Sequence, residues 1–104
     1  MAAAAPVFFL DAIDSTNAEA RRRAEAGETG PLWIAARQQT AGRGRRGREW
    51  ASDSGNLFTT LLMHTDCPAA EAAQVTFVAA LAVADLLDRY APPSLVTIKW
   101  PNDV

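Results

Sequence analysis

The chain has 104 residues, of which 49% are hydrophobic and 21% are charged, and its formal net charge is −2. This composition predicts one soluble globular domain, because disordered chains are poorer in apolar residues and carry more net charge. The single cysteine excludes an internal disulfide framework and suits a reducing compartment. The first ten residues lack a basic segment of the secretory type, and we find no run of the ~18 apolar residues that a membrane span needs, so we expect a cytoplasmic protein.

The predicted strands and helices alternate along the chain. Runs of β-branched and aromatic residues predict strands at residues 7–10, 32–36, 57–63 and 95–100. Capping signals and apolar residues at helical spacing predict helices at residues 17–26 and 68–90. A stretch rich in Gly, Arg, Ser and Asp predicts a loop at residues 40–56. This interleaved order favours a sheet covered by helices.

Local signals set the ends of the two predicted helices. Thr16 and Glu19 have the spacing of a capping box, so Thr16 is predicted to cap the first helix. Gly27 is predicted to end that helix. Asp66 is predicted to cap the second helix, with Pro68 in its first turn.

Apolar patterning predicts which segments are buried. The strand at residues 57–63 is apolar and Thr-rich, which favours a buried strand. The apolar stripe of residues 68–90 favours a largely buried helix. The three arginines at residues 21–23 are expected on a solvated helix face. Three aromatic residues are expected in the core, namely Phe8, Phe9 and Trp33.

Positive charge concentrates in one loop. Half of the ten basic residues fall between positions 37 and 48, a window without an acidic residue: Arg37, Arg43, Arg45, Arg46 and Arg48. The glycines between them let the backbone approach a ligand closely, and guanidinium groups bind carboxylate or phosphate through paired hydrogen bonds. In a mildly acidic protein, such a loop indicates a site that holds an anion locally. Taken alone, however, a Gly/Arg loop is most often a solvated connection or an RNA contact.

Two further polar clusters lie next to the ends of predicted strands. One stands at a strand-to-helix junction and comprises Ser15, Thr16 and Asn17. Side chains and free backbone N–H groups can meet a small polar ligand there, although a plain helix cap explains the cluster more simply. The other sets a cation, an amide and a carboxylate just past the last strand, with an ordinary turn as the alternative: Lys99, Asn102 and Asp103.

No metal-binding constellation is predicted. His64 and Cys67 are three residues apart, but two ligands do not make a zinc site. Both residues are therefore expected to be structural, and no order of Ser, His and Asp indicates a catalytic triad.

Together, the motifs and their order resemble biotin protein ligase. The resemblance extends from about Phe8 to Val104 and rests on Ser15-Thr16-Asn17, residues 39–50, Gly55-Asn56-Leu57 and Lys99-Trp100-Pro101-Asn102-Asp103. Residues 39–50 read Gln-Thr-Ala-Gly-Arg-Gly-Arg-Arg-Gly-Arg-Glu-Trp. The resemblance implies an α/β fold of the α+β type, in which a mixed sheet is covered by helices, as in the catalytic domain of biotin and lipoate ligases.

The resemblance also implies an activity. Enzymes of this type use ATP and Mg²⁺ to activate their substrate biotin as biotinyl-5′-adenylate, and then transfer biotin to a lysine of a biotin carboxyl carrier protein, such as that of acetyl-CoA carboxylase. Two alternatives stay open: acyl adenylation of the lipoate ligase type, and a non-catalytic RNA-binding module that uses the Gly/Arg loop. The loop sequence favours biotin over lipoate. The acidic net charge and the scattered aromatic residues disfavour RNA, so no nucleic acid and no membrane is expected as a partner.

The resemblance assigns roles to residues of this chain. The ureido ring of biotin would be held by Ser15, Thr16 and Asn17, and Gln39 would line the same pocket. The biotin carboxylate and the adenylate phosphate would be contacted by Arg43, Gly44 and Arg45, with Trp50 close to the ligand. The residues near the ATP phosphates and Mg²⁺ would be Asn102 and Asp103. The catalytic residues would be Arg45 and Lys99.

Finally, the resemblance implies that residues 1–104 are part of a catalytic domain. The family's site includes a further lysine and glycine-rich strands after the Lys-Trp-Pro-Asn-Asp motif, and a small carboxyl-terminal domain follows them. No winged-helix DNA-binding domain precedes the site here, so a repressor role is not expected. We therefore expect residues 1–104 alone to be marginally stable and unable to form biotinyl-adenylate, while a homodimer of the whole enzyme is left open.

Overall fold

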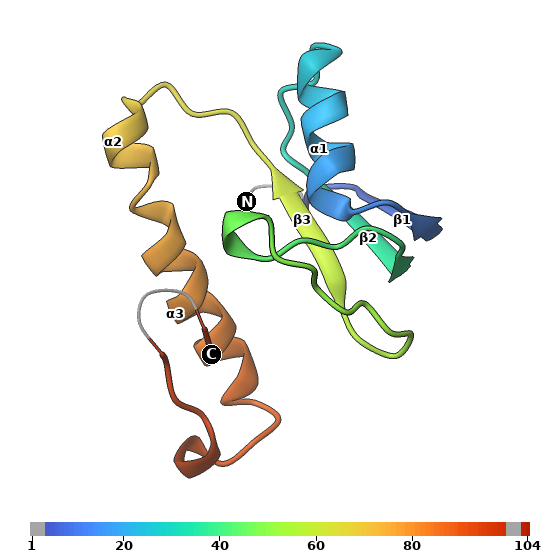
Figure 1. Cartoon of the computed structure of the whole chain (residues 1–104). Coiled ribbons are helices and arrows are strands. Elements are labelled where there is room, and N and C mark those ends of the chain that lie inside the picture. Colours follow the sequence, from blue (N-terminus) through green and yellow to red (C-terminus); the bar gives the residue numbers. More distant parts are fainter. Residues whose placement is uncertain (1–3, 100–102) are drawn as a thin grey trace. The chain divides into compact units, whose positions relative to one another are not determined.

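A computed structural model describes residues 4–99 and 103–104, without the side chain of Arg45. By its internal contacts, the chain divides into two compact units between His64 and Thr65 (Figure 1). The first unit holds the sheet and one long helix, and the second is helical.

The first unit is built on a three-stranded mixed sheet. Its strands are β1 (Val7–Ile13), β2 (Leu32–Gln39) and β3 (Phe58–Leu62), in the order β1-β2-β3. β1 runs parallel to β2, and β2 runs antiparallel to β3, which confirms the mixed sheet. β1 and β2 are each three residues longer than the sequence predicted, because their parallel pairing continues to Ile13 and Gln39.

Helix α1 (Thr16–Glu25) connects β1 to β2 and packs on β2 and β3 (Figure 1). The polypeptide leaves α1 through Gly27, whose φ of 100° is the left-handed conformation that glycine adopts without strain. A parallel pair of strands needs such a crossover, and a helix supplies it. The parallel ends of β1 and β2 therefore lie beside the start of α1, where the polar cluster of the sequence stands.

The core of the first unit lies between α1 and one face of the sheet. Ala20 of α1 packs against Leu32 and Ile34 of β2, and the edges of this cluster are closed by Leu10 and Leu62. Ile34 is fully buried, with 0% of its surface exposed. Period-two alternation places these strand residues on one face, so α1 covers a continuous apolar strip.

Three aromatic residues expected in the core are exposed instead. Trp33 and Phe9 lie on the sheet face away from α1. Successive residues of a strand point to opposite faces, so Trp33, next to the helix-facing Ile34, points away from the helix. Phe8 lies on edge strand β1, and the guanidinium of Arg23 covers its ring at 4.3 Å from the centroid. The prediction for β3 was also too strong, because only Phe58 of that strand is buried.

The second unit departs from the predicted single helix. It contains α2 (Ala69–Ala72) and α3 (Val75–Leu87), separated at residues 73–74 by hydrogen bonds of i→i+3 type. Pro68, and not Asp66, is the N-cap of α2, without a side-chain bond. Only Ala80 of α3 is buried, so the expectation of a largely buried helix is wrong for this structure.

The strand predicted at residues 95–100 is absent from its described part, residues 95–99. Residues Pro93–Leu95 form a short 3₁₀ turn, because two consecutive prolines remove two backbone donors that a ladder would need. Lys99 and Asp103 then pair in an isolated antiparallel bridge. Trp100, Pro101 and Asn102 lie outside the described residues.

One apolar stretch of the second unit bears on the expectation that no segment is long enough to span a membrane. Residues Ala69–Leu87 are long and apolar enough to cross a membrane, judged by length and composition only. The sequence analysis had found no such run. The core helix of a soluble protein passes the same test, and the stretch is divided between α2 and α3, so this is weak evidence for a membrane span.

The core arrangement predicts a contrast between two aliphatic residues. Substitution of Ile34 by Ala should lower the free energy of unfolding by about 2–5 kcal/mol, because it leaves a cavity under α1. Leu57, which is 77% exposed, is the matched control, and Leu57→Ala should cost less than about 0.5 kcal/mol. Urea unfolding followed by tryptophan fluorescence measures both, and equal midpoints for the two variants would contradict this core.

Candidate functional site

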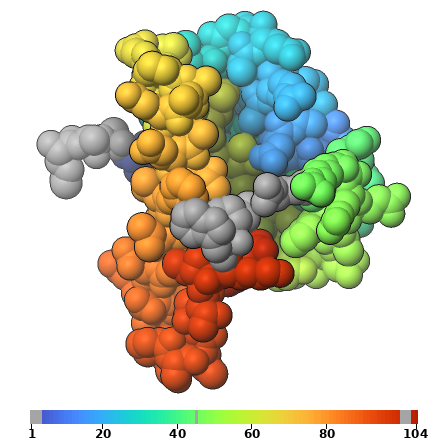
Figure 2. Space-filling model, turned by 60° about the vertical axis from the view of Figure 1, so that its left-hand side comes forward, coloured from blue at the N-terminus to red at the C-terminus, as the bar shows by residue number. Residues whose placement is uncertain are grey.

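A cleft of about 680 Å³ opens in the first unit beside the start of α1. Its walls come from the β1–α1 junction, the outer side of α1, the end of β2 and the first residues of the Gly/Arg loop. Figure 2 shows α1 in blue and this loop in green, next to each other on one face of the first unit. The lining residues are Asp14, Ser15, Asn17, Ala18, Arg21, Arg22, Glu25, Gln39, Ala41, Arg43 and Gly44.

Ser15 caps α1, which corrects the prediction that Thr16 does so. Ser15 has an extended backbone, with φ −157° and ψ 152°, and its Oγ accepts a hydrogen bond from Ala18 N at 3.0 Å. Thr16 is the first helical residue and only 4% of its surface is exposed. Glu19 does not complete a capping box, because its carboxylate binds Arg22 and Arg23 instead.

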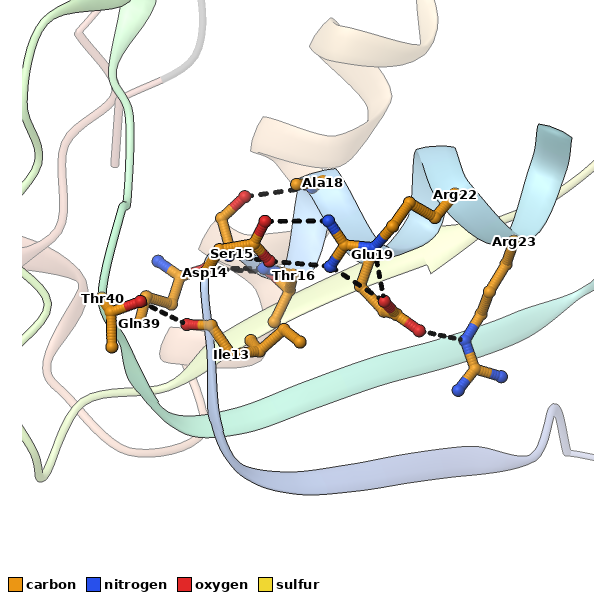
Figure 3. Close-up of polar contacts among 10 residues, drawn as sticks. All are labelled: Ile13, Asp14, Ser15, Thr16, Ala18, Glu19, Arg22, Arg23, Gln39 and Thr40. Carbon is orange, nitrogen blue, oxygen red and sulfur yellow. Dashed lines mark hydrogen bonds and ion pairs between the residues drawn. The ribbon is translucent and has the colours of Figure 1, made fainter.

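The side chain of Gln39 joins the end of β2 to α1. Its Oε1 accepts from Thr16 N at 2.8 Å and from Thr16 Oγ1 at 3.2 Å, as Figure 3 shows for the pair. Its Nε2 donates to Ser52 Oγ at 3.1 Å, and Ser52 Oγ donates to Trp50 O at 3.3 Å. The amide group thus satisfies a free N–H group of the first helical turn and fixes the return of the loop.

Thr60 of β3 is a polar contact that the sequence reasoning missed. Its single hydroxyl proton can go to Asn17 Oδ1 at 2.6 Å or to Thr16 Oγ1 at 2.9 Å. A signal for it exists in the sequence, because Thr60 shares the helix-facing side of β3 with Phe58 and Leu62. A threonine between two apolar residues at a period of two needs a polar partner on that side.

The Gly/Arg loop predicted from composition has a hydrogen-bonded base. Trp50 N donates to Gly42 O at 3.0 Å, and Gly44 N donates to Arg48 O at 2.7 Å, so the two arms of the loop pair like strands. The turn at its tip uses positive φ at Arg46 (61°) and at Gly47 (73°). The loop therefore presents its backbone and side chains from a paired base.

Gly42 permits this close pairing. A Cβ at this position would lie 2.6 Å from Ser52 Oγ and 3.0 Å from Trp50 O. Any side chain would push the returning arm away from Gln39. Trp50 itself is 61% exposed beside the loop.

The acidic residue Asp14 organises the charge around α1. Its two carboxylate oxygens accept from Arg22 Nη1 and Nη2, each at 2.8 Å, and Oδ1 also accepts from Ser15 N at 2.8 Å (Figure 3). The hydrogen bonds from Arg22 hold the pKa of Asp14 well below its ordinary value. The same ion pair raises the pKa of Arg22.

The second carboxylate on α1, Glu19, is also paired. It binds Arg22 and Arg23 at 2.9 Å each, and the hydrogen bond from Arg23 is the main cause that lowers the pKa of Glu19. Of the three arginines expected on a solvated face, Arg22 and Arg23 are thus ion-paired. Within the described part of the chain, Arg21 and Arg43 have no ion pair, although both line the cleft.

The structure brings most of the predicted biotin-binding residues together in the first unit. Ser15, Asn17, Gln39, Arg43 and Gly44 line the cleft. Thr16 is bonded to Gln39 beside it, and Trp50 pairs with Gly42 at the base of the loop.

The remaining predicted residues lie elsewhere. The side chain of Arg45 and all of Asn102 are outside the described residues. Lys99 and Asp103 belong to the second unit, where Lys99 N donates to Asp103 O at 2.6 Å. Among the residues that the structure describes, no group of three or more His, Cys, Asp or Glu side chains could hold a metal ion.

The cleft thus brings the polar start of α1 together with Arg43 and Gly44 of the Gly/Arg loop, and a helix start is a place where anions are bound. Comparison with known proteins gives the family. The profile of the Biotin/lipoate A/B protein ligase family matches residues 9–104, and the chain belongs to this family.

Individual members of the family are similar to this chain over most of its length. The chain is 52% identical over 97 residues to a biotin–[acetyl-CoA-carboxylase] ligase of Paracoccus denitrificans. This match covers 92% of this chain and 40% of that protein. It is 37% identical over 99 residues to the bifunctional ligase/repressor BirA of Escherichia coli, covering 94% of this chain and 30% of that protein. The chain therefore spans two-fifths or less of the length of these two relatives.

Solved structures agree with the fold. The biotin protein ligase of Aquifex aeolicus, in complex with biotin and ATP, superposes with a TM-score of 0.71 at 28% identity, covering 93% of this chain and 40% of that one. The biotin protein ligase of Leishmania major, in complex with biotinyl-5-AMP, gives 0.70 at 29% identity, covering 93% and 45%. The predicted fold class and the predicted family are thus both confirmed.

The ion pair of Asp14 predicts how the site responds to acid. Carboxylates with a lowered folded pKa contribute stability above their ordinary pKa, 3.8 for Asp14 and 4.5 for Glu19, and lose it as the pH falls towards the folded values. Arg22→Gln should therefore raise the pKa of Asp14 towards its ordinary value. Titration of the side-chain carboxyl signals by NMR measures this. Arg21→Gln is the control, and an equal midpoint for Asp14 in both variants would refute the pairing.

Proposed function

We propose that this chain is the first part of the catalytic domain of a biotin protein ligase. The whole protein activates biotin with ATP to biotinyl-5′-adenylate and transfers the biotin to a lysine of a biotin carboxyl carrier protein. The observation that carries the proposal is the joining of Gln39, Thr16, Asn17 and Thr60 by hydrogen bonds beside a cleft that Arg43, without an ion pair among the described residues, also lines. The relatives named as biotin ligases support the same reading.

The polar cluster suits the ureido ring of biotin. That ring presents two N–H donors and one carbonyl acceptor, so it needs acceptors and donors close together. Ser15, Asn17 and Gln39 offer carbonyl, hydroxyl and amide groups on the wall of one cleft. The Thr60 proton has two alternative acceptors, so a bound ligand can take over one of them without leaving a buried group unpaired.

The loop suits the charged part of the reaction. When the biotin carboxylate attacks the α-phosphorus of ATP, two anions approach each other, and fixed positive charge lowers that barrier. Arg43 and the backbone of Gly44 line the cleft, and Arg43 has no ion pair within the described residues. We assign the same role to the side chain of Arg45 from the family resemblance, together with a position for Trp50 close to the ligand.

ATP and Mg²⁺ complete the proposal. Mg²⁺ prefers oxygen ligands and in nucleotide sites is held mainly by phosphate oxygens with one or two carboxylates. We place Lys99, Asn102 and Asp103 near the phosphates on the resemblance, with Lys99 supplying positive charge.

The alternatives are less well supported. Lipoate ligases belong to the same family, but the relatives and structures described above are named for biotin. RNA binding would use the same loop, yet the chain has a net charge of −2 and its aromatic residues are scattered along the sequence, which disfavours an extended RNA contact. We expect the protein in the cytoplasm, where its carrier protein is made.

The activity can be tested directly on the whole protein. With biotin, ATP and Mg²⁺, it should release pyrophosphate only when biotin is present, and calorimetric titration should show tighter binding of biotinyl-adenylate than of biotin. The extra affinity follows from a phosphate that biotin lacks and that arginine can bind through two hydrogen bonds. Lipoate in place of biotin is the control for the family alternative. Pyrophosphate release that is independent of biotin, or faster with lipoate, would overturn the proposal.

The role of the loop predicts a selective defect. Arg43→Gln should weaken binding of biotinyl-adenylate by about tenfold or more, because a charge-assisted contact to the phosphate is worth roughly 1.5–3 kcal/mol, while binding of biotin changes less. Arg48→Gln removes the same charge from the same loop but outside the cleft lining, and serves as the matched control. Equal losses in the two variants would show that only the overall charge of the loop matters.

A further inference from the structure

Asp14 connects both walls of the cleft. Its carboxylate holds Arg22 in the second turn of α1 and the backbone N–H of Ser15. Its backbone carbonyl accepts from Ala41 N at 2.8 Å, and Ala41 directly precedes Gly42 at the root of the loop. The neighbouring Ile13 carbonyl accepts from Thr40 N at 2.9 Å in the same way. Asp14 thus joins the start of α1, through the contacts drawn in Figure 3, to the base of the Gly/Arg loop, through the bond from Ala41 N.

Arg22 is fully engaged by this arrangement. Besides its two bonds to Asp14, its Nε donates to Glu19 Oε1 at 2.9 Å. Although Arg22 lines the cleft, its charge is neutralised by two carboxylates, so it is poorly suited to bind a ligand anion itself. Arg21, its neighbour on the same wall, has no ion pair within the described residues.

We propose that Asp14 and Arg22 form a positioning pair for the biotin site. The pair holds Ser15, Thr16 and Asn17 at a fixed distance from the loop root, so that the polar cluster and the cationic loop meet opposite ends of one ligand. This inference rests on the proposed function and adds two residues that act by holding their neighbours in place. Binding sites need their groups within about 0.5 Å of the productive geometry, which supporting residues provide.

The exposure of the pair separates positioning from overall stability. The side chains of Arg22 and Asp14 are 49% and 42% exposed, and ion pairs at such exposure stabilise a fold little. A purely structural pair at this exposure would therefore change neither folding nor binding much. A positioning pair changes ligand binding more than it changes the melting temperature.

The test compares three arginine variants of the same helix in the whole protein. Arg22→Gln should raise the KM for biotin by about five- to tenfold, about 1–1.4 kcal/mol, with the KM for ATP and the melting temperature within the range of the controls. Arg21→Gln removes a charge from the same cleft wall without breaking an ion pair. Arg23→Gln breaks a pair with the same Glu19 but has no contact with Asp14.

Two further variants sharpen the test. Arg22→Lys should restore the KM for biotin only in part, because an ammonium keeps the charge but cannot form the two-pronged contact. Asp14→Asn should behave like Arg22→Gln, and the double variant should be no worse than either, since both remove one interaction.

Each outcome decides a specific point. If Arg22→Gln raises the KM for biotin no more than Arg21→Gln or Arg23→Gln does, the positioning role is wrong while the ligase function stands. The same conclusion follows if Arg22→Gln lowers the melting temperature and raises the KM for ATP as much as the KM for biotin. If Lys restores binding completely, charge alone acts and the proposed geometry is wrong. If the unmodified whole protein neither binds nor activates biotin, the proposed function fails, and the positioning role fails with it.

Discussion

The site depends on the carboxamide of Gln39, which lies where the parallel strand β2 ends beside the start of α1. The first N–H groups of a helix have no partner within the helix, and a parallel crossover brings them against the end of the next strand. Gln39 satisfies Thr16 N from one end of its amide group and holds Ser52 with the other. A single side chain therefore closes the helix start and anchors the returning arm of the loop, and the approach is so close that only glycine fits at position 42.

The sequence predicted what local chemistry determines. The strands at β1, β2 and β3, helix α1 and the end of α1 at Gly27 follow from β-branched runs and a glycine that accepts positive φ. The cap was misplaced by one residue because Ser15 and Thr16 both carry hydroxyl groups, and the backbone geometry decides between them. Thr60 was missed because its partners, Thr16 and Asn17, are over 40 residues away in sequence.

The failures concern properties that depend on packing between segments. Hydrophobicity placed Trp33 in the core, but the alternation of β2 gives Ile34 the helix-facing side and leaves Trp33 on the other. The apolar pattern of residues 68–90 is continuous and therefore predicts one helix. In the structure, a short stretch of i→i+3 hydrogen bonds separates α2 from α3, and the spacing of apolar residues does not show such an interruption. Pairing of a strand at residues 95–99 likewise requires a partner that no local signal specifies.

Acidic and basic side chains are unevenly distributed along this mildly acidic chain. The acidic residues Asp14, Glu19 and Glu28 neutralise Arg22 and Arg23 along α1. The window from residue 37 to 48 contains no acid, so within the described residues Arg43, Arg46 and Arg48 have no ion pair. Among the described residues, the positive charge that lines the cleft without an ion pair therefore comes from Arg21 of α1 and Arg43 of the loop. The proposed function uses this charge at one end of a small acid, whereas an RNA backbone would need positive charge along a continuous track.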